Sequence, residues 1–166
     1  MADSRGVTCA PQVRHRHAHG VRTVPGQGST GSSPAARMAA TGRTILGIAA
    51  DVRQPDTIAK AVAATAEKFG KVDTLVNGAA GNFPAPAAGL SPNGFRTVID
   101  IDLNGTFNMS RAAFELLQKA GNGFILNISA TLHYHGTPLQ IHAAAAKAGV
   151  DAVTRNLAVE WGGAGI

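Results

Sequence analysis

A single lysine in an alanine-rich stretch is the first residue of this sequence that could do chemistry. Lys147 lies in the run H-A-A-A-A-K-A-G-V at residues 142–150, which otherwise has the small apolar residues of a packed helix. An ammonium group on such a face can reach a nucleotide ribose or a bound water molecule. One turn earlier stands Ala143, which offers neither an acid nor a hydroxyl group. Lys147 therefore has no proton-transfer partner of that kind on its own helix face.

Other polar residues stand where strands are expected to end. These segments are D-V-R at 51–53, N-G-A-A-G-N-F at 77–83 and S-A-T-L-H-Y at 129–134. In a parallel α/β sheet, ligands bind outside the carboxyl ends of the strands. Asp102 and Asn104 are poor helix formers within a helical stretch, which indicates a reason other than propensity for their presence. These segments together are the candidate site.

The hydrophobic pattern predicts the elements that must position this site. Short apolar runs predict strands over 44–50, 72–77 and 123–128. A helix opens at Pro55 and ends at Gly70, a long helical region begins near Asn93, and a last helix covers about 141–161. Strands that alternate with helices predict an α/β fold: a partial Rossmann-like parallel sheet with flanking helices.

The N-terminal residues differ from the rest. Residues 1–38 are rich in Gly, Ser, Pro, Arg and His and predict a disordered or unrelated leader, followed by one domain over 39–166. The leader holds five arginines and one acid, so ten basic and nine acidic residues follow position 40 and no basic face for nucleic acid is expected. G-Q-G-S-T-G at 26–31 matches G-x-G-x-x-G, but neither a buried strand nor a full helix flanks it. No apolar run is long enough to span a bilayer, and no secretory signal is visible.

Together these motifs resemble the short-chain dehydrogenase/reductase family over about residues 39–166. L-V-N-G-A-A-G at 75–81 is similar to its N-N-A-G motif, and D-L-N-G at 102–105 to its N-x-x-G motif. I-L-N-I-S-A at 125–130 is similar to its serine-bearing strand, and Lys147 to its helix lysine. Three family residues are replaced: the tyrosine by Ala143, the serine by Ala130 and the asparagine by Asp102.

One subgroup shares these departures. G-A-A-G-N-F at 78–83, I-D-I-D-L-N-G-T-F-N at 99–108 and H-A-A-A-A-K-A-G-V-D-A at 142–152 closely resemble peroxisomal 2,4-dienoyl-CoA reductases. The resemblance implies NADPH-dependent reduction of dienoyl-CoA to 3-enoyl-CoA in unsaturated fatty acid degradation, and a peroxisomal location. A dienolate intermediate takes its proton at the α-carbon, and water held by Asp102 and Lys147 can supply that proton.

The same resemblance implies roles for further residues. Asp51 would bond the adenine, Lys147 also the nicotinamide ribose, and the backbone of Asn77, Gly78 and Ala79 would lie against the cofactor. Arg53, Phe83, Ser91 and Asn93 would line the acyl-CoA path. Structural alternatives stay open for several of these: a helix cap for Asp51, a core position for Phe83, a solvated charge for Arg53 and a snorkelling surface residue for Lys147.

Tyr134 and the histidines have competing interpretations. Tyr134, the only tyrosine, is either a proton donor or an exposed loop residue. His133, His135 and His142 do not indicate a metal site, because no carboxylate or thiol completes one.

Three functions stay open at this point. The first is the dienoyl-CoA reductase, with a chain that lacks the first βαβ unit and the C-terminal strand. The second is a non-catalytic fragment or isoform that associates with full-length subunits. The third is an ordinary alcohol or ketone reductase, which Ala130 and Ala143 disfavour. The last two long helices are where this family forms homo-oligomers. A cytoplasmic or mitochondrial location stays open beside the peroxisomal one.

Overall fold

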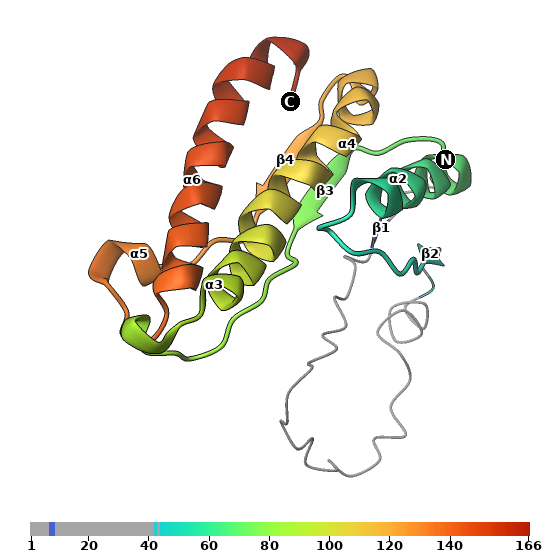
Figure 1. The fold of residues 1–166 in the computed structure, drawn as a ribbon. Coiled ribbons are helices and arrows are strands. Elements are labelled where there is room, and N and C mark those ends of the chain that lie inside the picture. Colours follow the sequence, from blue (N-terminus) through green and yellow to red (C-terminus); the bar gives the residue numbers. More distant parts are fainter. Residues whose placement is uncertain (1–6, 9–41, 43) are drawn as a thin grey trace.

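The computed structural model describes residues 7–8, 42 and 44–166. Strand β3 (Thr74–Asn77) pairs in parallel with β4 (Phe124–Asn127), in the register Leu75 opposite Ile125 and Asn77 opposite Asn127. Helix α4 (Gly105–Ala120) lies against this pair, with β3 and β4 behind it in Figure 1. The α/β architecture predicted from the sequence is confirmed.

The alternation of side chains along β3 explains which face α4 covers. Leu75 is buried against Ala113 and Leu117, while Val76 points to the opposite face and is exposed. Ile125 packs against the same cluster as Leu75. Because side chains alternate along a strand, one face of the pair supplies the core and the other carries exposed apolar residues.

Helix α2 (Pro55–Phe69) packs against α4 on the side away from α6 (Figure 1). A proline at its first position suits the helix start because the missing N–H would have no partner there. Gly70 ends the helix in the left-handed conformation at φ 80°, and its N–H donates to the Ala66 carbonyl. The predicted limits of this helix are therefore confirmed.

The long helical region has three parts. Helix α3 (Pro92–Ile99) runs into a π-helix, η2 (Asp100–Asn104), and then into α4. The last helix, α6 (Ile141–Trp161), follows the short helix α5 (Leu132–His135) and packs against α3 and η2. A second core cluster of Val98, Ala143 and Ala146 lies at that contact. Short 3₁₀ turns occupy η1 (Ala87–Gly89) and η3 (Gly162–Ala164).

The first predicted strand is shorter than expected and lies in a separate sheet. Within 44–50 only β2 (Ile45–Leu46) is a strand, and it pairs in parallel with β1 (Val7–Thr8) rather than with β3. Gly47, Ala49 and Ala50 offer little side chain for packing against a neighbouring strand. A strand at residues 7–8 was not predicted. The rest of the predicted leader, including the glycine motif at 26–31, lies outside the described residues.

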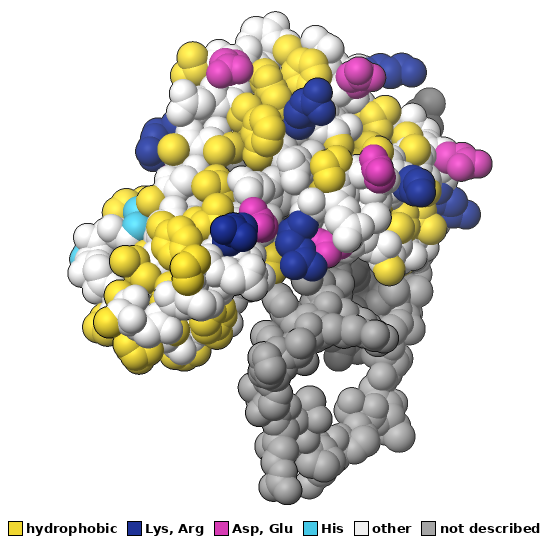
Figure 2. Space-filling model, in the orientation of Figure 1, with side chains coloured by type: hydrophobic (Ala, Val, Ile, Leu, Met, Phe, Trp, Pro, Cys, Tyr) yellow, Lys and Arg dark blue, Asp and Glu magenta, His cyan; other side chains and the backbone are white. Residues whose placement is uncertain are grey.

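None of the helices in the described part of the chain is long and apolar enough to cross a membrane. Figure 2 shows apolar side chains gathered over the end of the molecule formed by α3, α5 and the loop before α3. The charged side chains in that view lie mainly over the rest of the surface.

Candidate active site

Asp102 and Lys147 lie side by side inside the protein. The Lys147 ammonium on α6 is 3.5 Å from Oδ2 of Asp102 on η2, and it donates a hydrogen bond of 2.9 Å to the Ile128 carbonyl at the end of β4. The other carboxylate oxygen accepts the Gly81 N–H at 2.6 Å. Asp102 is 2% and Lys147 8% exposed, so Lys147 is not a snorkelling surface residue. The sheet end, η2 and α6 thus build one ionic pair.

The position of Asp102 depends on the π-helix. Residues 100–104 are wound with one extra residue in the turn, between two regular helices. Single π turns within α-helices are rare, and they occur frequently at functional sites. Asp102 and Asn104, which are poor helix formers, both lie in this π-helix. The sequence indicated an unusual reason for these residues but did not predict the π-helix.

Burial raises the pKa of the Asp102 carboxyl above its ordinary value. The Gly81 N–H, the Lys147 ammonium and, last, His142 act in the opposite direction without cancelling that effect. Asp102 therefore keeps its proton to a higher pH than an exposed aspartate does. A carboxyl tuned upward in this way is suited to proton transfer.

An open hollow lies beyond the end of β3. The sequence-predicted cofactor residues Asn77, Gly78 and Ala79 all line it, together with Val52, Val76, Gly105, Thr106 and Met109. The Asn77 amide donates to Ser110 and Asn127, at 3.0 and 2.8 Å. Asn77 therefore fixes the strand end through its side chain, which leaves its backbone at the hollow. The lining does not include Asp51 or Lys147.

Gly105 lets α4 approach the floor of this hollow closely. A Cβ there would lie 2.6 Å from Cγ2 and 2.9 Å from Cβ of Val52. Val52 is buried, and its branched side chain is stiff about χ1, so it cannot turn aside easily. A glycine is therefore required where η2 becomes α4.

We expect Gly105→Ala to lower the free energy of unfolding by about 1–3 kcal/mol, the usual cost of overpacking a core. Urea unfolding of the 166-residue chain measures this. The matched control is Gly162→Ala, whose Cβ would meet no atom within 4 Å and whose φ is −56°. Equal stability of the two variants would show that α4 does not approach Val52 in this way.

Asp51 and Arg53 pair with each other at the end of the segment that follows β2. The Asp51 carboxylate accepts the Arg53 backbone N–H at 2.9 Å and both guanidinium Nε and NH2. The hydrogen bond that the Arg53 guanidinium donates to Asp51 raises the pKa of Arg53. An adenine-binding role for Asp51 and an acyl-CoA role for Arg53 stay predictions. Both roles would use a carboxylate and a guanidinium that hold each other in place.

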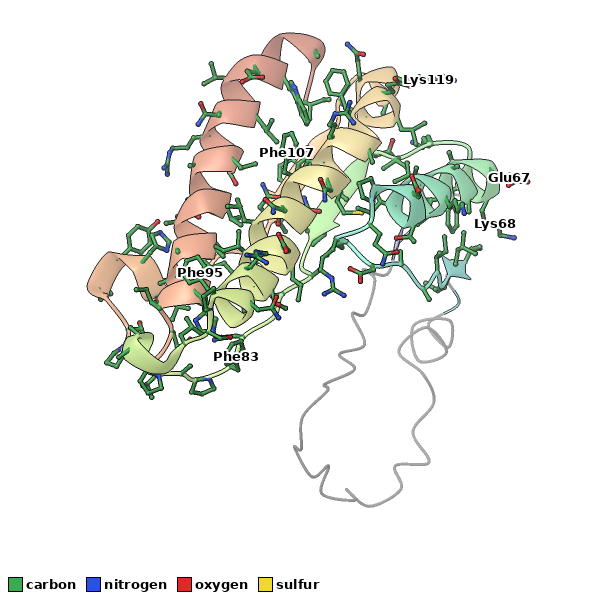
Figure 3. All side chains as sticks on the ribbon, viewed as in Figure 1. Glu67, Lys68, Phe83, Phe95, Phe107 and Lys119 are labelled. Atoms are coloured by element: carbon green, nitrogen blue, oxygen red, sulfur yellow. The ribbon has the colours of Figure 1, made fainter. Side chains whose placement is uncertain are left out.

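The other predicted acyl-CoA residues lie around the start of α3. Ser91 caps this helix, because its hydroxyl accepts the Gly94 N–H at 3.0 Å. Asn93 is exposed in the first turn. Phe83 precedes them on the loop from β3, and Figure 3 shows it near that end of the molecule. Its side chain is 38% exposed, so a pure core role is wrong.

His142 was considered in the sequence only as a metal ligand, yet it lies at this site. Its ring is fully buried, and the Phe83 ring contacts it edge-on with centroids 4.6 Å apart. The loop that carries Phe83 is bound to the segment before α6 by two hydrogen bonds, Asn82 to Gln140 at 2.7 Å and Ala85 to Leu139 at 2.9 Å. The signal that the sequence offered for His142 was a polar residue next to the alanines of the last helix.

Tyr134 belongs to a different cluster. It is 66% exposed, and its hydroxyl donates to Asp151 at 2.9 Å, which raises the tyrosine pKa. His133 bonds the same carboxylate oxygen at 2.9 Å. The pKa of Asp151 is lowered, first by the nearby Ser129 hydroxyl and then by Tyr134 and His133, although the Ser129 contact falls short of hydrogen-bond geometry. Residues 44–166 contain no group of three His, Cys, Asp or Glu arranged to hold a metal ion.

Comparison with known proteins gives a consistent family. The family model described as "Enoyl-(Acyl carrier protein) reductase", of the short-chain dehydrogenase/reductase type, matches residues 2–166. A "Peroxisomal 2,4-dienoyl-CoA reductase [(3E)-enoyl-CoA-producing]" of Danio rerio is 56% identical over 126 residues, or 76% of this chain and 42% of the relative. One of the same name from Arabidopsis thaliana is 57% identical over 125 residues, 70% of this chain and 42% of the relative.

A solved structure gives the same fold. The crystal structure of a short chain dehydrogenase from Bacillus anthracis has a TM-score of 0.68 and 50% identity, and the match covers 71% of this chain and 49% of that one. The chain spans less than half the length of the curated relatives it matches.

Proposed function

The chain belongs to the short-chain dehydrogenase/reductase family, and we propose that its site serves the NADPH-dependent reduction of 2,4-dienoyl-CoA to 3-enoyl-CoA. The buried pair of Asp102 and Lys147 carries this proposal. The pair belongs to a sequence in which Ala143 and Ala130 replace the family tyrosine and serine, whose hydroxyl groups carbonyl reduction needs. The names of the curated relatives support the same reaction.

The residues of this chain can deliver the proton. When bound, NADPH supplies a hydride to carbon 5 of the conjugated thioester, and a proton must then reach carbon 2. Burial raises the pKa of Asp102, so this carboxyl binds a proton more readily than an exposed aspartate does and can pass it on. A water molecule at the Asp102–Lys147 pair would accept that proton and pass one of its own to carbon 2. Lys147 keeps the carboxylate charge compensated once the proton has left.

The residues that line the hollow at the end of β3 support the cofactor proposal. Gly78 and Ala79 present backbone and little side chain there, which lets a ribose or flat ring approach closely. Because family members use a nicotinamide cofactor, Asn77, Gly78 and Ala79 would hold part of it, with Lys147 at the nicotinamide ribose and Asp51 at the adenine. The preference for NADPH over NADH is part of the proposal.

The acyl-CoA would approach past Phe83, Ser91 and Asn93, with Arg53 near the same path. Figure 2 shows apolar side chains gathered at that end of the molecule. Phe83, Leu139 and Ile141 are large apolar residues with exposed side chains. The peroxisomal names of the relatives support a peroxisomal location for this chain. A homo-oligomer formed through α4 and α6 is the assembly that we propose.

Oxidation of NADPH by the 166-residue chain, followed at 340 nm with 2,4-hexadienoyl-CoA and with a simple ketone, tests the proposal. We expect turnover of the thioester and none of the ketone. Turnover of the ketone alone would contradict the substrate class. Saturable NADPH binding separates an active chain from one that only associates with longer subunits, because the latter would bind no cofactor.

A further inference from the structure

His142 is a buried imidazole with no visible hydrogen-bond partner. Its exposure is 0%, and neither Nδ1 nor Nε2 bonds another atom of the described residues. A neutral imidazole has one N–H donor and one acceptor nitrogen. Leaving such groups unsatisfied inside a protein costs stability, so a buried orphan requires an explanation. A ligand that bonds the ring only when it is bound would provide one.

The Phe83 ring covers this imidazole. It contacts His142 edge-on at 62° between the ring planes, while its other end lies near Gly94 of α3. A Cβ at position 94 would come within 3.1 Å of the Phe83 ring, so glycine leaves the room that the ring uses. The loop on either side of Phe83 is fastened at Asn82 and Ala85. Rotation of the side chain, rather than movement of the loop, is therefore the way to uncover His142.

The loop that places Phe83 against His142 also carries Gly81, whose N–H donates to the Asp102 carboxylate at 2.6 Å. The reaction builds negative charge on the thioester oxygen as well as on carbon 2, and preorganised donors at such an oxygen stabilise the transition state. Two other buried side chains have unsatisfied atoms in the described part of the chain, Ser129 and His133, and both belong to the Asp151 cluster. His142 is thus the unsatisfied buried donor beside the Asp102–Lys147 pair.

We propose that His142 donates a hydrogen bond to the thioester carbonyl oxygen of the acyl-CoA, after the substrate displaces the Phe83 ring. This inference rests on the proposed function and adds a catalytic residue to it. The imidazole N–H would stabilise the dienolate oxygen, while the Asp102–Lys147 pair supplies the proton at carbon 2. No atom is transferred to or from His142.

Kinetics of three variants test the role. His142→Leu keeps a side chain of similar size without a donor, and His142→Gln restores an N–H donor. We expect His142→Leu to lower kcat/KM for 2,4-hexadienoyl-CoA at least tenfold, mainly through kcat, with the Kd for NADPH unchanged. His142→Gln should recover most of that loss, and exposed His135→Leu should match the unaltered chain. Equal kcat/KM in His142→Leu and the unaltered chain would overturn the inference.

Labelling with diethyl pyrocarbonate tests whether the Phe83 ring covers His142, and this test needs no turnover. We expect His142 to react at least tenfold more slowly than His135 in the unaltered chain and to become reactive in Phe83→Ala. Protection of His142 in both proteins, or in neither, would overturn the gating by Phe83.

Failure of the proposed function remains distinguishable from failure of this inference. If the unaltered chain reduces no dienoyl-CoA, the proposed function fails. The Tm of His142→Leu then shows whether the unsatisfied ring is kept for a ligand or for structure. A higher Tm supports a ring kept unsatisfied for a ligand, and a lower Tm shows a structural role and overturns the inference.

Discussion

We expect Asp102→Ala to reduce dienoyl-CoA turnover by about 10²–10⁴-fold, the usual contribution of a positioned general acid. The alanine removes the carboxyl that lies 3.5 Å from the Lys147 ammonium and accepts the Gly81 N–H. NADPH binding should change little, because Asp102 does not line the hollow beyond β3. Steady-state kcat together with a fluorescence titration of NADPH measures both effects.

The matched control for this variant is Asp100→Ala. Asp100 belongs to the same π-helix but bonds Asn104, at 2.9 Å, instead of Lys147. Its removal should leave kcat within a factor of about three, as expected for a residue outside the transferred proton's path. Unchanged turnover in Asp102→Ala would show that the proton comes from another group.

Lys147→Met should have the largest effect on stability. Methionine keeps the unbranched stem, but it leaves the buried Asp102 carboxyl without its ammonium partner and the Ile128 carbonyl without its donor. Breaking one side of a buried pair typically costs about 3–5 kcal/mol. Urea unfolding at neutral pH measures the loss, with exposed Lys119→Met as the control. A loss no greater than that of the control would show that the pair is not buried.

The pH dependence of this loss has a definite sign. The pKa of Asp102 is higher in the folded than in the unfolded protein, so the folded state binds the proton more tightly. The stability contribution of Asp102 is therefore fully present below its unfolded pKa and is lost as pH rises through the folded pKa. Without the ammonium the folded pKa rises further, so we expect the penalty of Lys147→Met to shrink as pH falls. A penalty independent of pH would mean that Asp102 is not the affected group.

Local sequence signals predicted the helices and the candidate pair well. Helix α2 begins at Pro55 and is capped by Gly70, as predicted. The periodic apolar residues of the last helix predicted its observed limits, Ile141–Trp161. The replacement of Asn by Asp102 beside an isolated Lys147 indicated a pair that the structure brings within 3.5 Å. These features depend on neighbours in sequence or on motifs with fixed spacing.

Features that depend on tertiary packing were not predicted. A run of apolar residues at 44–50 does not show which strand will pair with it, and only Ile45–Leu46 forms a ladder. The π-helix η2 contacts both α4 and α6, and local sequence signals do not report such contacts. The Asp51–Arg53 pairing and the burial of His142 under Phe83 are side-chain contacts that residue types alone do not specify.

The position of solvent deuterium in the product tests most directly the protonation at carbon 2 that the Asp102–Lys147 pair is proposed to serve. With NADPH and 2,4-hexadienoyl-CoA in D₂O, proton delivery at the pair predicts one deuterium on carbon 2 and a double bond between carbons 3 and 4. Mass spectrometry and NMR of the product distinguish the carbons. Deuterium on carbon 4 with a double bond between carbons 2 and 3 would contradict the account.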